Sequence, residues 1–194
     1  MASLPIPRFT EEEYLRLEET AFEKSEFHDG QMFAMAGGTA NHALIMNAIG
    51  TILHRQKPAG CRVFSSELRI KVERAGLYTY PDCSLLCGDP VFTNSKKNSL
   101  RNPVLLVEVL SESTEAASSQ IARGEKFEMY RMLDSLREYL LIHSDRRHLE
   151  HYSRQDDNSW LLREYSGPDA IAPISRMGIQ IPLSELYADA FDLA

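Results

Sequence analysis

Three side chains in the sequence have the types and surroundings to support metal-dependent chemistry. Glu108 lies inside the apolar run 104–110, where an ionised carboxylate is costly to bury unless it is paired or holds a metal ion. Asp82 follows Pro81 at the start of a second apolar run. Lys126 falls on the apolar face of an expected helix, where a lysine either extends to solvent or meets a carboxylate.

Together these residues fit the hydrolysis of a phosphodiester bond by a metal-activated water. Carboxylate oxygens suit Mg²⁺, and the metal polarises the phosphate, helps to deprotonate the water and neutralises the leaving oxygen. A lysine can orient the water or offset the charge of the transition state. Each residue alone also has a structural explanation. Glu108 could face a solvated edge or an arginine, and Pro-Asp pairs are common in turns.

Hydrophobic periodicity predicts the elements that must position these three residues. Residues 104–110 are predicted to form a central buried strand. Residues 78–87 are predicted to form a second strand, whose start Pro81 makes an edge or irregular position. A helix is predicted over residues 121–133. The order of helices, strands, one helix and strands predicts a single α/β (α+β) domain over residues 1–194.

Other segments complete this domain. Thr10 and Glu13 form a capping-box pattern before a short helix, Asp29-Gly30 indicates a hairpin, and a second helix begins at Thr39 or Asn41. Residues 68–72 alternate as a half-buried strand does. The remaining predicted elements are a three-stranded meander over 138–143, 149–153 and 160–165, an extended piece at 179–183, and a short helix from Ser184.

Composition limits the function and the location. The net charge of −7 excludes a protein that is basic all over and coats phosphates, but not a local basic cleft. No run of 18 apolar residues is present, and the N-terminus lacks the apolar stretch of a secretory signal. Cys61, Cys83 and Cys87 include no Cys-x-x-Cys pair. We expect Cys83 and Cys87 to act as small buried thiols, which indicates a reducing compartment, the cytoplasm.

At these residues the chain resembles the PD-(D/E)XK nuclease superfamily, and within it the putative restriction endonuclease group, a domain of unknown function. The matching segments follow the same order over most of the chain: Glu26–Gly30, Tyr80–Ser84, Pro103–Thr114, Gly124–Tyr130 and Ser135–Tyr139. The resemblance implies a restriction-endonuclease-like αβββαβ core, with a mixed central sheet flanked by helices, to which this chain adds a C-terminal β-meander.

The resemblance also implies roles for individual residues. Asp82 and Glu108 match the two acidic metal ligands. The superfamily's lysine normally follows the second acid on the same strand as Glu-x-Lys, but Leu110 occupies that position here. Lys126 matches a lysine supplied by the following helix. Glu26 matches an acidic position that can serve as an additional, weaker metal ligand.

Several further positions are weaker candidates for support of the site. Those that could lie beside the metal or the phosphate are His42, Glu67, Gln120 and Arg123. An ordinary surface or structural role is the alternative for each of these four, and it is the favoured one for His42 and Glu67. Ala122 and His143 stand where many relatives carry Asp, and Ala122 could weaken the positioning of Lys126. His148 and His151 are not interpreted as a zinc pair, because residues three apart on a strand face opposite sides.

These observations predict a Mg²⁺-dependent endonuclease, with Mn²⁺ as a substitute, that hydrolyses DNA, or RNA as the alternative substrate. A homodimer is expected because restriction-type enzymes cut two strands by pairing two sites, and no membrane partner is expected. One alternative is a catalytically weak or inactive nucleic-acid-binding protein on the same fold. Another is an assembly protein in which Glu108 and Lys126 form a structural ion pair.

Overall fold

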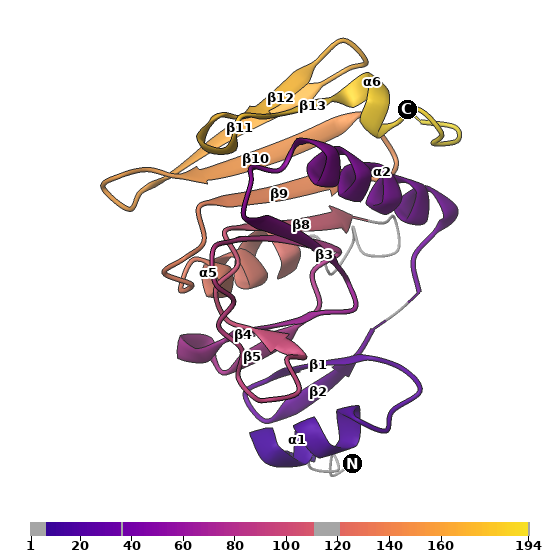
Figure 1. Ribbon diagram of the computed structural model, residues 1–194. Coiled ribbons are helices and arrows are strands. Elements are labelled where there is room, and N and C mark those ends of the chain that lie inside the picture. The colour runs from indigo at the N-terminus through magenta and orange to yellow at the C-terminus, as the bar shows by residue number, and fades with distance from the viewer. Residues whose placement is uncertain (1–6, 36, 111–120, 194) are drawn as a thin grey trace.

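Two β-sheets meet near Asp82 in the computed structural model. The structure describes residues 7–35, 37–110 and 121–193, and it describes residues 121–123 by their backbone alone. The main sheet has six strands in the order β11-β10-β9-β8-β6-β3 (Figure 1). Their bounds are β3 Cys61–Ser65, β6 Cys83–Cys87, β8 Leu105–Leu110, β9 Glu138–His143, β10 His148–Arg154 and β11 Trp160–Ser166. Strands β8 and β9 are parallel, and the other neighbours are antiparallel.

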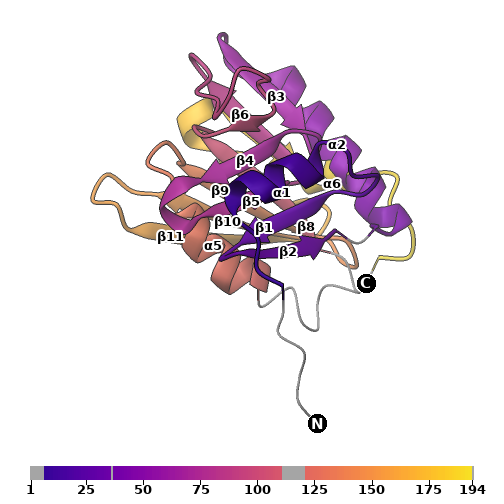
Figure 2. The ribbon, with the colours of Figure 1, turned by 90° about the horizontal axis from the view of Figure 1, so that it is seen from below.

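The second sheet has five short strands in the order β2-β1-β5-β4-β7. Their bounds are β1 Ser25–His28, β2 Gln31–Ala34, β4 Arg69–Val72, β5 Leu77–Thr79 and β7 Ser99–Leu100. Helix α1, Glu11–Glu18, lies on the outer side of this sheet (Figure 2). The ring of Tyr14 stacks on Phe27 at a centroid distance of 4.9 Å, and this contact attaches the helix to β1.

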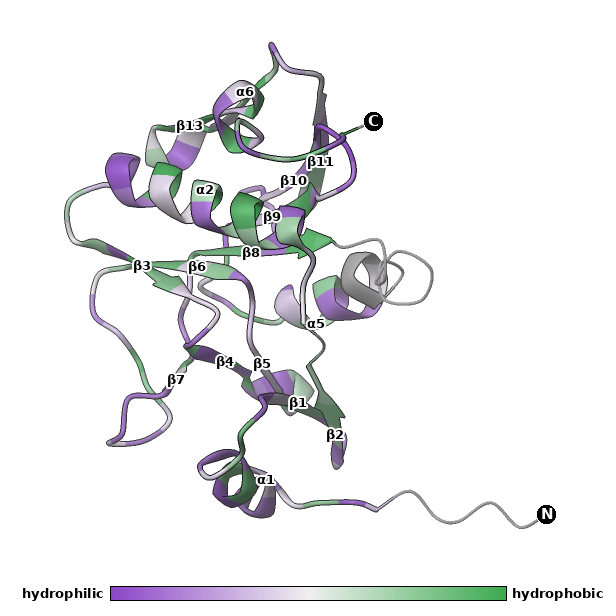
Figure 3. Cartoon of the chain, turned by 90° about the vertical axis from the view of Figure 1, so that its right-hand side faces the viewer, coloured by the Kyte–Doolittle hydropathy of each residue, from purple (hydrophilic) through white to green (hydrophobic). Residues whose placement is uncertain are grey.

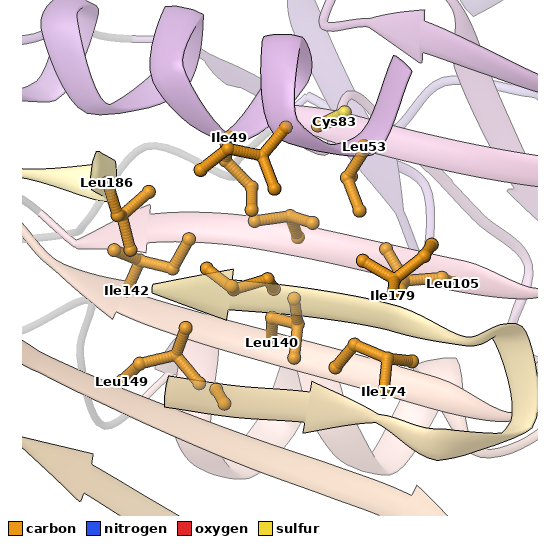
Figure 4. Packing of buried hydrophobic residues seen from close by; sticks show 14 of the residues in the cluster. Ile49, Leu53, Cys83, Leu105, Leu140, Ile142, Leu149, Ile174, Ile179 and Leu186 are labelled. Atoms are coloured by element: carbon orange, nitrogen blue, oxygen red, sulfur yellow. The ribbon is translucent and has the colours of Figure 1, made fainter. Parts of the chain in front are cut away.

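Helix α2, Ala40–Gln56, covers one face of the main sheet and lies over β3, β6 and β8 (Figure 3). Its residues Ile49 and Leu53 point toward Leu105, Leu140 and Ile142 of the sheet (Figure 4). The hairpin of β12 and β13 and the short helix α6 extend this layer; their bounds are Ile171–Ile174, Ile179–Pro182 and Leu183–Leu186.

The opposite face of the main sheet packs against a short helical segment. Residues Ile121–Lys126 form a π-helix, η2, which continues into the α-helix α5, Phe127–Tyr130. Two single turns of 3₁₀-helix, Glu73–Ala75 and Ser175–Met177, complete the elements. Because successive side chains of a strand alternate in direction, Val107 and Val109 enter the core beneath α2, whereas Glu108 points toward α5. Strand β8 therefore presents its one carboxylate on the side of the helical segment.

The structure confirms the predicted mixed α/β architecture, the central strand, the 25–35 hairpin and the C-terminal meander, which extends the main sheet through β9, β10 and β11. The predicted strand over 78–87 is wrong in one respect. It divides at Tyr80–Asp82 into β5 and β6, which belong to different sheets. Pro81 lacks an N–H for a ladder, and the break at this point places Asp82 where the two sheets meet.

Two further elements differ from their sequence pattern. Strand β4 is buried along its whole length rather than half-buried, because Lys71 is covered and pairs with Glu11 of α1. The helix expected over 121–133 begins as a π-helix, and its α-helical part is only Phe127–Tyr130. Lys126 is the last residue of the π-helix, a local widening that often occurs at functional sites.

The expectation for Cys87 is also wrong, because it forms a disulfide with Cys61. The two residues are direct partners in the antiparallel register of β3 and β6, so the strand pairing itself brings their side chains together. Cys83 is buried and remains a free thiol. Over the described residues, no helix has the length and apolarity needed to cross a lipid bilayer.

Candidate metal centre

The two acidic residues that the sequence singles out lie next to each other across neighbouring strands. Cys83 pairs with Val107 in the antiparallel register of β6 and β8, so Asp82, one residue before β6, lies opposite Glu108. The amide N–H of Val109 donates a hydrogen bond to Oδ2 of Asp82 at 2.7 Å. This bond holds the carboxylate of Asp82 against β8, although Asp82 itself lies outside the ladder.

Lys126 joins these strands to the second sheet. Its Nζ lies 2.7 Å from Oε1 of Glu26 and 3.7 Å from Oε1 of Glu108. Glu26 belongs to β1, and its Oε1 also accepts a hydrogen bond from the Thr79 hydroxyl on β5. The interruption between β5 and β6 leaves Asp82 at the junction of the two sheets. The site thus combines Glu26 of the second sheet, Glu108 of the main sheet and Asp82 between them, with the Lys126 ammonium between Glu26 and Glu108.

Tyr130 fixes the orientation of Glu108 from the helical side. Its hydroxyl donates a hydrogen bond to Oε1 of Glu108 at 2.6 Å and lies 3.2 Å from the Thr79 hydroxyl. Tyr130 is fully buried, and it follows Lys126 by four residues, about one helical turn. Burial, followed by the neighbouring carboxylates of Glu108 and Glu26, raises the pKa of Tyr130 well above its usual value, so the phenol remains a donor.

His42 approaches the centre from the start of α2. Its Nε2 lies 3.3 Å from Oδ1 of Asp82, and its amide N–H donates to the hydroxyl of Thr39, which caps the helix. The hydrogen bond with Asp82 raises the pKa of His42, although burial opposes the shift. Gly38 makes room for the imidazole, because a Cβ at this position would lie 2.6 Å from Nδ1 of His42.

The centre has more carboxylates than cations, and its charges are largely shielded. The side chains of Asp82 and Glu108 are each 12% exposed. Burial raises the pKa of Glu108 to about 7; Lys126 opposes this shift, whereas Asp82 and Glu26 add to it. Burial would lower the pKa of Lys126, but Glu108 and Glu26 outweigh it and raise that pKa. The lysine therefore stays protonated.

The donor set fits a hard divalent cation. Oε1 of Glu108 and Oε1 of Glu26 carry the contacts described above, whereas over the described residues the Oε2 atoms of both have no hydrogen-bond partner. Clustered carboxylates that leave oxygens unused in a nearly buried site are the ligands that Mg²⁺ and Mn²⁺ prefer. A divalent ion would also offset the repulsion from Asp82 and Glu26 that adds to the effect of burial on the pKa of Glu108.

A hollow of about 400 Å³ borders this cluster. Its lining includes Asp82 and Cys83, His54 and Arg55 of α2, and Phe64 of β3. The hollow lies between α2 and β3 and reaches Asp82. The groove carries both apolar and basic side chains, which suits a ligand with flat rings and negative charge.

The other candidate residues have different outcomes. Glu67 is 78% exposed at its side chain and pairs with Lys24, and its described contacts do not include the cluster. Gln120 lies outside the described residues, and so does the side chain of Arg123. Sequence reasoning gave no role to Thr79 or Tyr130. The position of Tyr130 four residues after Lys126, on the same helix face, is the one signal that could have indicated it.

Comparisons with known proteins identify the fold and the family of this chain. A solved structure described as a putative nuclease belonging to DUF820, from Anabaena variabilis ATCC 29413, matches with a TM-score of 0.69 at 18% identity, over 91% of this chain and 96% of that one. At this identity the match establishes the fold alone. The fold and the family model together define a PD-(D/E)XK-like restriction endonuclease class.

The chain belongs to the Uma2 family, whose model is described as "Putative restriction endonuclease" and matches residues 11–184. Two uncharacterized proteins of Synechocystis sp. (strain ATCC 27184 / PCC 6803 / Kazusa) are each 36% identical to it. One, slr1290, aligns over 95% of this chain and 94% of its own length, and the other, sll1609, over 88% and 94%.

Proposed function

We propose that this protein is a divalent-metal-dependent endonuclease that hydrolyses phosphodiester bonds in DNA. The observation that carries the proposal is the opposition of Asp82 and Glu108 across β6 and β8, with Nζ of Lys126 3.7 Å from Glu108. Three groups of these types, in a nearly buried cluster beside an open groove, are what metal-assisted phosphodiester hydrolysis requires.

Each residue has a distinct part in this proposal. Asp82 and Glu108 would hold Mg²⁺ or Mn²⁺, with Glu26 as a further ligand; when bound, the ion supplies Lewis acidity and lowers the pKa of water. His42 positions Asp82 through its imidazole. Lys126 keeps its proton, because the neighbouring carboxylates raise its pKa, so it contributes positive charge beside the phosphate rather than acting as a base.

The substrate and the assembly follow from the same geometry. The groove beside Asp82 carries Arg55 and His54 for phosphate and Phe64 for a base. We favour DNA over RNA because of the restriction-endonuclease class. A homodimer would pair two sites for the two strands, and the exposed edge strand β11, with Leu161 and Leu162 38% and 43% exposed, is a candidate surface for it. The Cys61–Cys87 disulfide weakens the argument for the cytoplasm that rests on free thiols. Action on DNA is the argument that still favours this location.

Calorimetric titration tests the proposal directly. Mg²⁺ and Mn²⁺ are titrated into the wild-type chain and into Asp82→Asn, and nicking of supercoiled plasmid is followed in parallel with each ion. We expect binding and nicking by the wild type, and the loss of both in the variant. Binding that survives unchanged in Asp82→Asn would contradict the assignment of this metal centre.

One observation favours a second reading. The ammonium of Lys126 already lies between Glu26 and Glu108, which is the arrangement of a structural ion network in a nucleic-acid-binding or assembly protein without catalysis. In that case metal would not bind, and neutralising Glu108 would destabilise the fold, because a buried pair that loses one partner leaves the other charge uncompensated.

A further inference from the structure

A second group of metal-ligating side chains lies on the C-terminal meander, apart from the centre of Asp82 and Glu108. His143 ends β9, and His148 and Glu150 stand at the start of β10 (Figure 1). Each offers one ligand atom, and the three atoms lie within 4.8 Å of one another. The antiparallel register places His148 opposite His143, and Glu150 shares the face of His148 because it lies two residues further along the strand.

A fourth donor comes from the outer strand of the meander. Glu164 of β11 is the cross-strand partner of Glu150, and its Oε1 lies 3.4 Å from Nε2 of His148. His143 and Glu150 are buried, whereas the side chain of Glu164 is 58% exposed. Two imidazoles and two carboxylates form a donor set that suits Zn²⁺ and related transition-metal ions, unlike the carboxylate oxygens at Asp82 and Glu108.

Both imidazoles have an oxygen near the nitrogen that would not bind the metal, and His148 is hydrogen-bonded there. Nδ1 of His143 lies 3.7 Å from Oδ1 of Asp145, while its Nε2 lies 3.4 Å from Oε1 of Glu150. Nδ1 of His148 lies 2.8 Å from the hydroxyl of Ser166. Metal-ligating histidines usually have their second nitrogen bonded to an oxygen, which sets the ring orientation; His148 has such a bond with Ser166, whereas Asp145 lies near His143 without a hydrogen bond. In each ring Nε2 faces a carboxylate, that of Glu150 for His143 and that of Glu164 for His148.

The cluster already attracts a cation. The guanidinium of Arg146 lies 3.5 Å from Nε2 of His143 and 2.9 Å from Oδ2 of Asp145. The side chain of Arg146 is 41% exposed, so it can move into solvent when a smaller and more highly charged ion enters. Arg146 is therefore a competitor whose removal should favour a metal ion.

We propose that His143, His148 and Glu150, closed on the solvent side by Glu164, form a binding site for a transition-metal ion of the Zn²⁺ type. Its ligands come from β9, β10 and β11, so the bound ion would cross-link the three strands of the meander. The site shares no ligand with the nuclease centre and differs from it in ligand chemistry, and it does not depend on the proposed function.

The test is a titration of Zn²⁺ into the full chain in excess Mg²⁺, which occupies the carboxylate centre. We expect one Zn²⁺ per chain for the wild type and for Asp82→Asn. Glu150→Gln and His148→Ala should each weaken binding by at least about tenfold, and Arg146→Ala should tighten it. His28→Ala removes a histidine of β1, outside the meander and the groove, and serves as the matched control, with affinity unchanged.

Two additional measurements keep the test decisive. Co²⁺ replaces Zn²⁺ as a probe, and its visible absorption bands should be intense for the wild type and lost in Glu150→Gln. Circular dichroism without metal shows whether each variant folds; because Glu164 is exposed, Glu164→Gln provides a weakened site even if the buried changes unfold the chain. The proposal is overturned if the wild type does not bind Zn²⁺, if folded ligand variants bind it as the wild type does, or if Asp82→Asn removes the binding.

Discussion

The hydroxyl of Tyr130 donates a hydrogen bond to Oε1 of Glu108 at 2.6 Å, and this contact joins α5 to the central strand β8. It directs one oxygen of the carboxylate toward the helix and leaves the other available. A carboxylate with one fixed oxygen is a better ligand than a freely rotating one, because less orientational freedom is lost when the metal binds.

Removing this hydroxyl tests its part in metal binding. Tyr130→Phe retains the ring in the core, so the fold should persist with a loss of about 1–2 kcal/mol in the free energy of unfolding. Mg²⁺ affinity should fall by about tenfold or more, as measured by calorimetry. Tyr165→Phe, a tyrosine on β11, is the matched control and should bind as the wild type does. Equal Mg²⁺ affinity in the two variants would show that the Tyr130 hydroxyl does not contribute to metal binding.

Metal binding should depend on pH through Glu108. Its pKa is raised to about 7, and only the deprotonated carboxylate can ligate a metal. The apparent Mg²⁺ affinity should therefore increase by up to about tenfold per pH unit below pH 7 and level off above it. Titrations at pH 6, 7 and 8 check this. An affinity that is constant over this range would show that Glu108 does not gate binding.

Glu108→Gln separates the nuclease reading from the structural ion pair. When the pKa of a carboxyl group is higher in the folded than in the unfolded state, its ionisation lowers the free energy of unfolding. This destabilisation is absent at low pH and appears as the pH rises from about 4.5 through 7. The neutral variant should thus unfold like the wild type at pH 4 and be more stable at pH 8, by on the order of 1 kcal/mol. Its melting temperature should no longer respond to Mg²⁺.

The ion-pair reading predicts the opposite result for the same variant. There the loss of the Glu108 charge leaves Lys126 nearly buried without its partner, and the free energy of unfolding at pH 8 should fall. Denaturant melts of both chains at pH 4 and pH 8, without metal and then with Mg²⁺, distinguish the two outcomes.

Lys126→Met should abolish cleavage without abolishing metal binding. The ammonium is placed to offset negative charge on the phosphate, and its loss should lower the single-turnover cleavage rate by about 100-fold or more. Mg²⁺ affinity should be maintained or increased, because a competing cation is removed from Glu26 and Glu108. Lys97→Met, on an exposed loop, is the control. Parallel loss of binding and cleavage would instead indicate that Lys126 organises the ligands.

Gly38→Ala should disturb the site through His42. The added Cβ would lie 2.6 Å from Nδ1 of His42, so the imidazole must move away from Asp82. We expect Mg²⁺ affinity to fall several-fold, toward the value of His42→Ala. At neighbouring Gly37 a Cβ would meet nothing within 4 Å, and Gly37→Ala is the matched control. If both alanine variants lose affinity equally, backbone freedom of the Gly-Gly pair is responsible and the contact with His42 is not.

Local patterns in the sequence identified much of this centre. An acidic residue inside an apolar run indicates a buried carboxylate that is paired or holds a metal ion. The structure places Glu108 in β8, where every other residue of the strand is apolar and buried. The spacing of Lys126 on an apolar helix face predicted that the lysine either extends to solvent or meets a carboxylate, and in the structure its Nζ lies 3.7 Å from Glu108. These signals are visible because burial and periodicity act over a few neighbouring residues.

Tertiary structure decided which distant groups meet. Glu26 lies 100 residues before Lys126 and comes from the second sheet rather than the sheet of Glu108. The hydroxyl of Thr79 reaches it because β1 and β5 pair with Phe27 opposite Tyr78, which brings Thr79 opposite Glu26. The same holds for Cys61 with Cys87 and for His143 with His148, which depend on strand register. No local pattern encodes such pairings, because they depend on how separate strands align and pack, and that alignment is set by the free energy of the whole core.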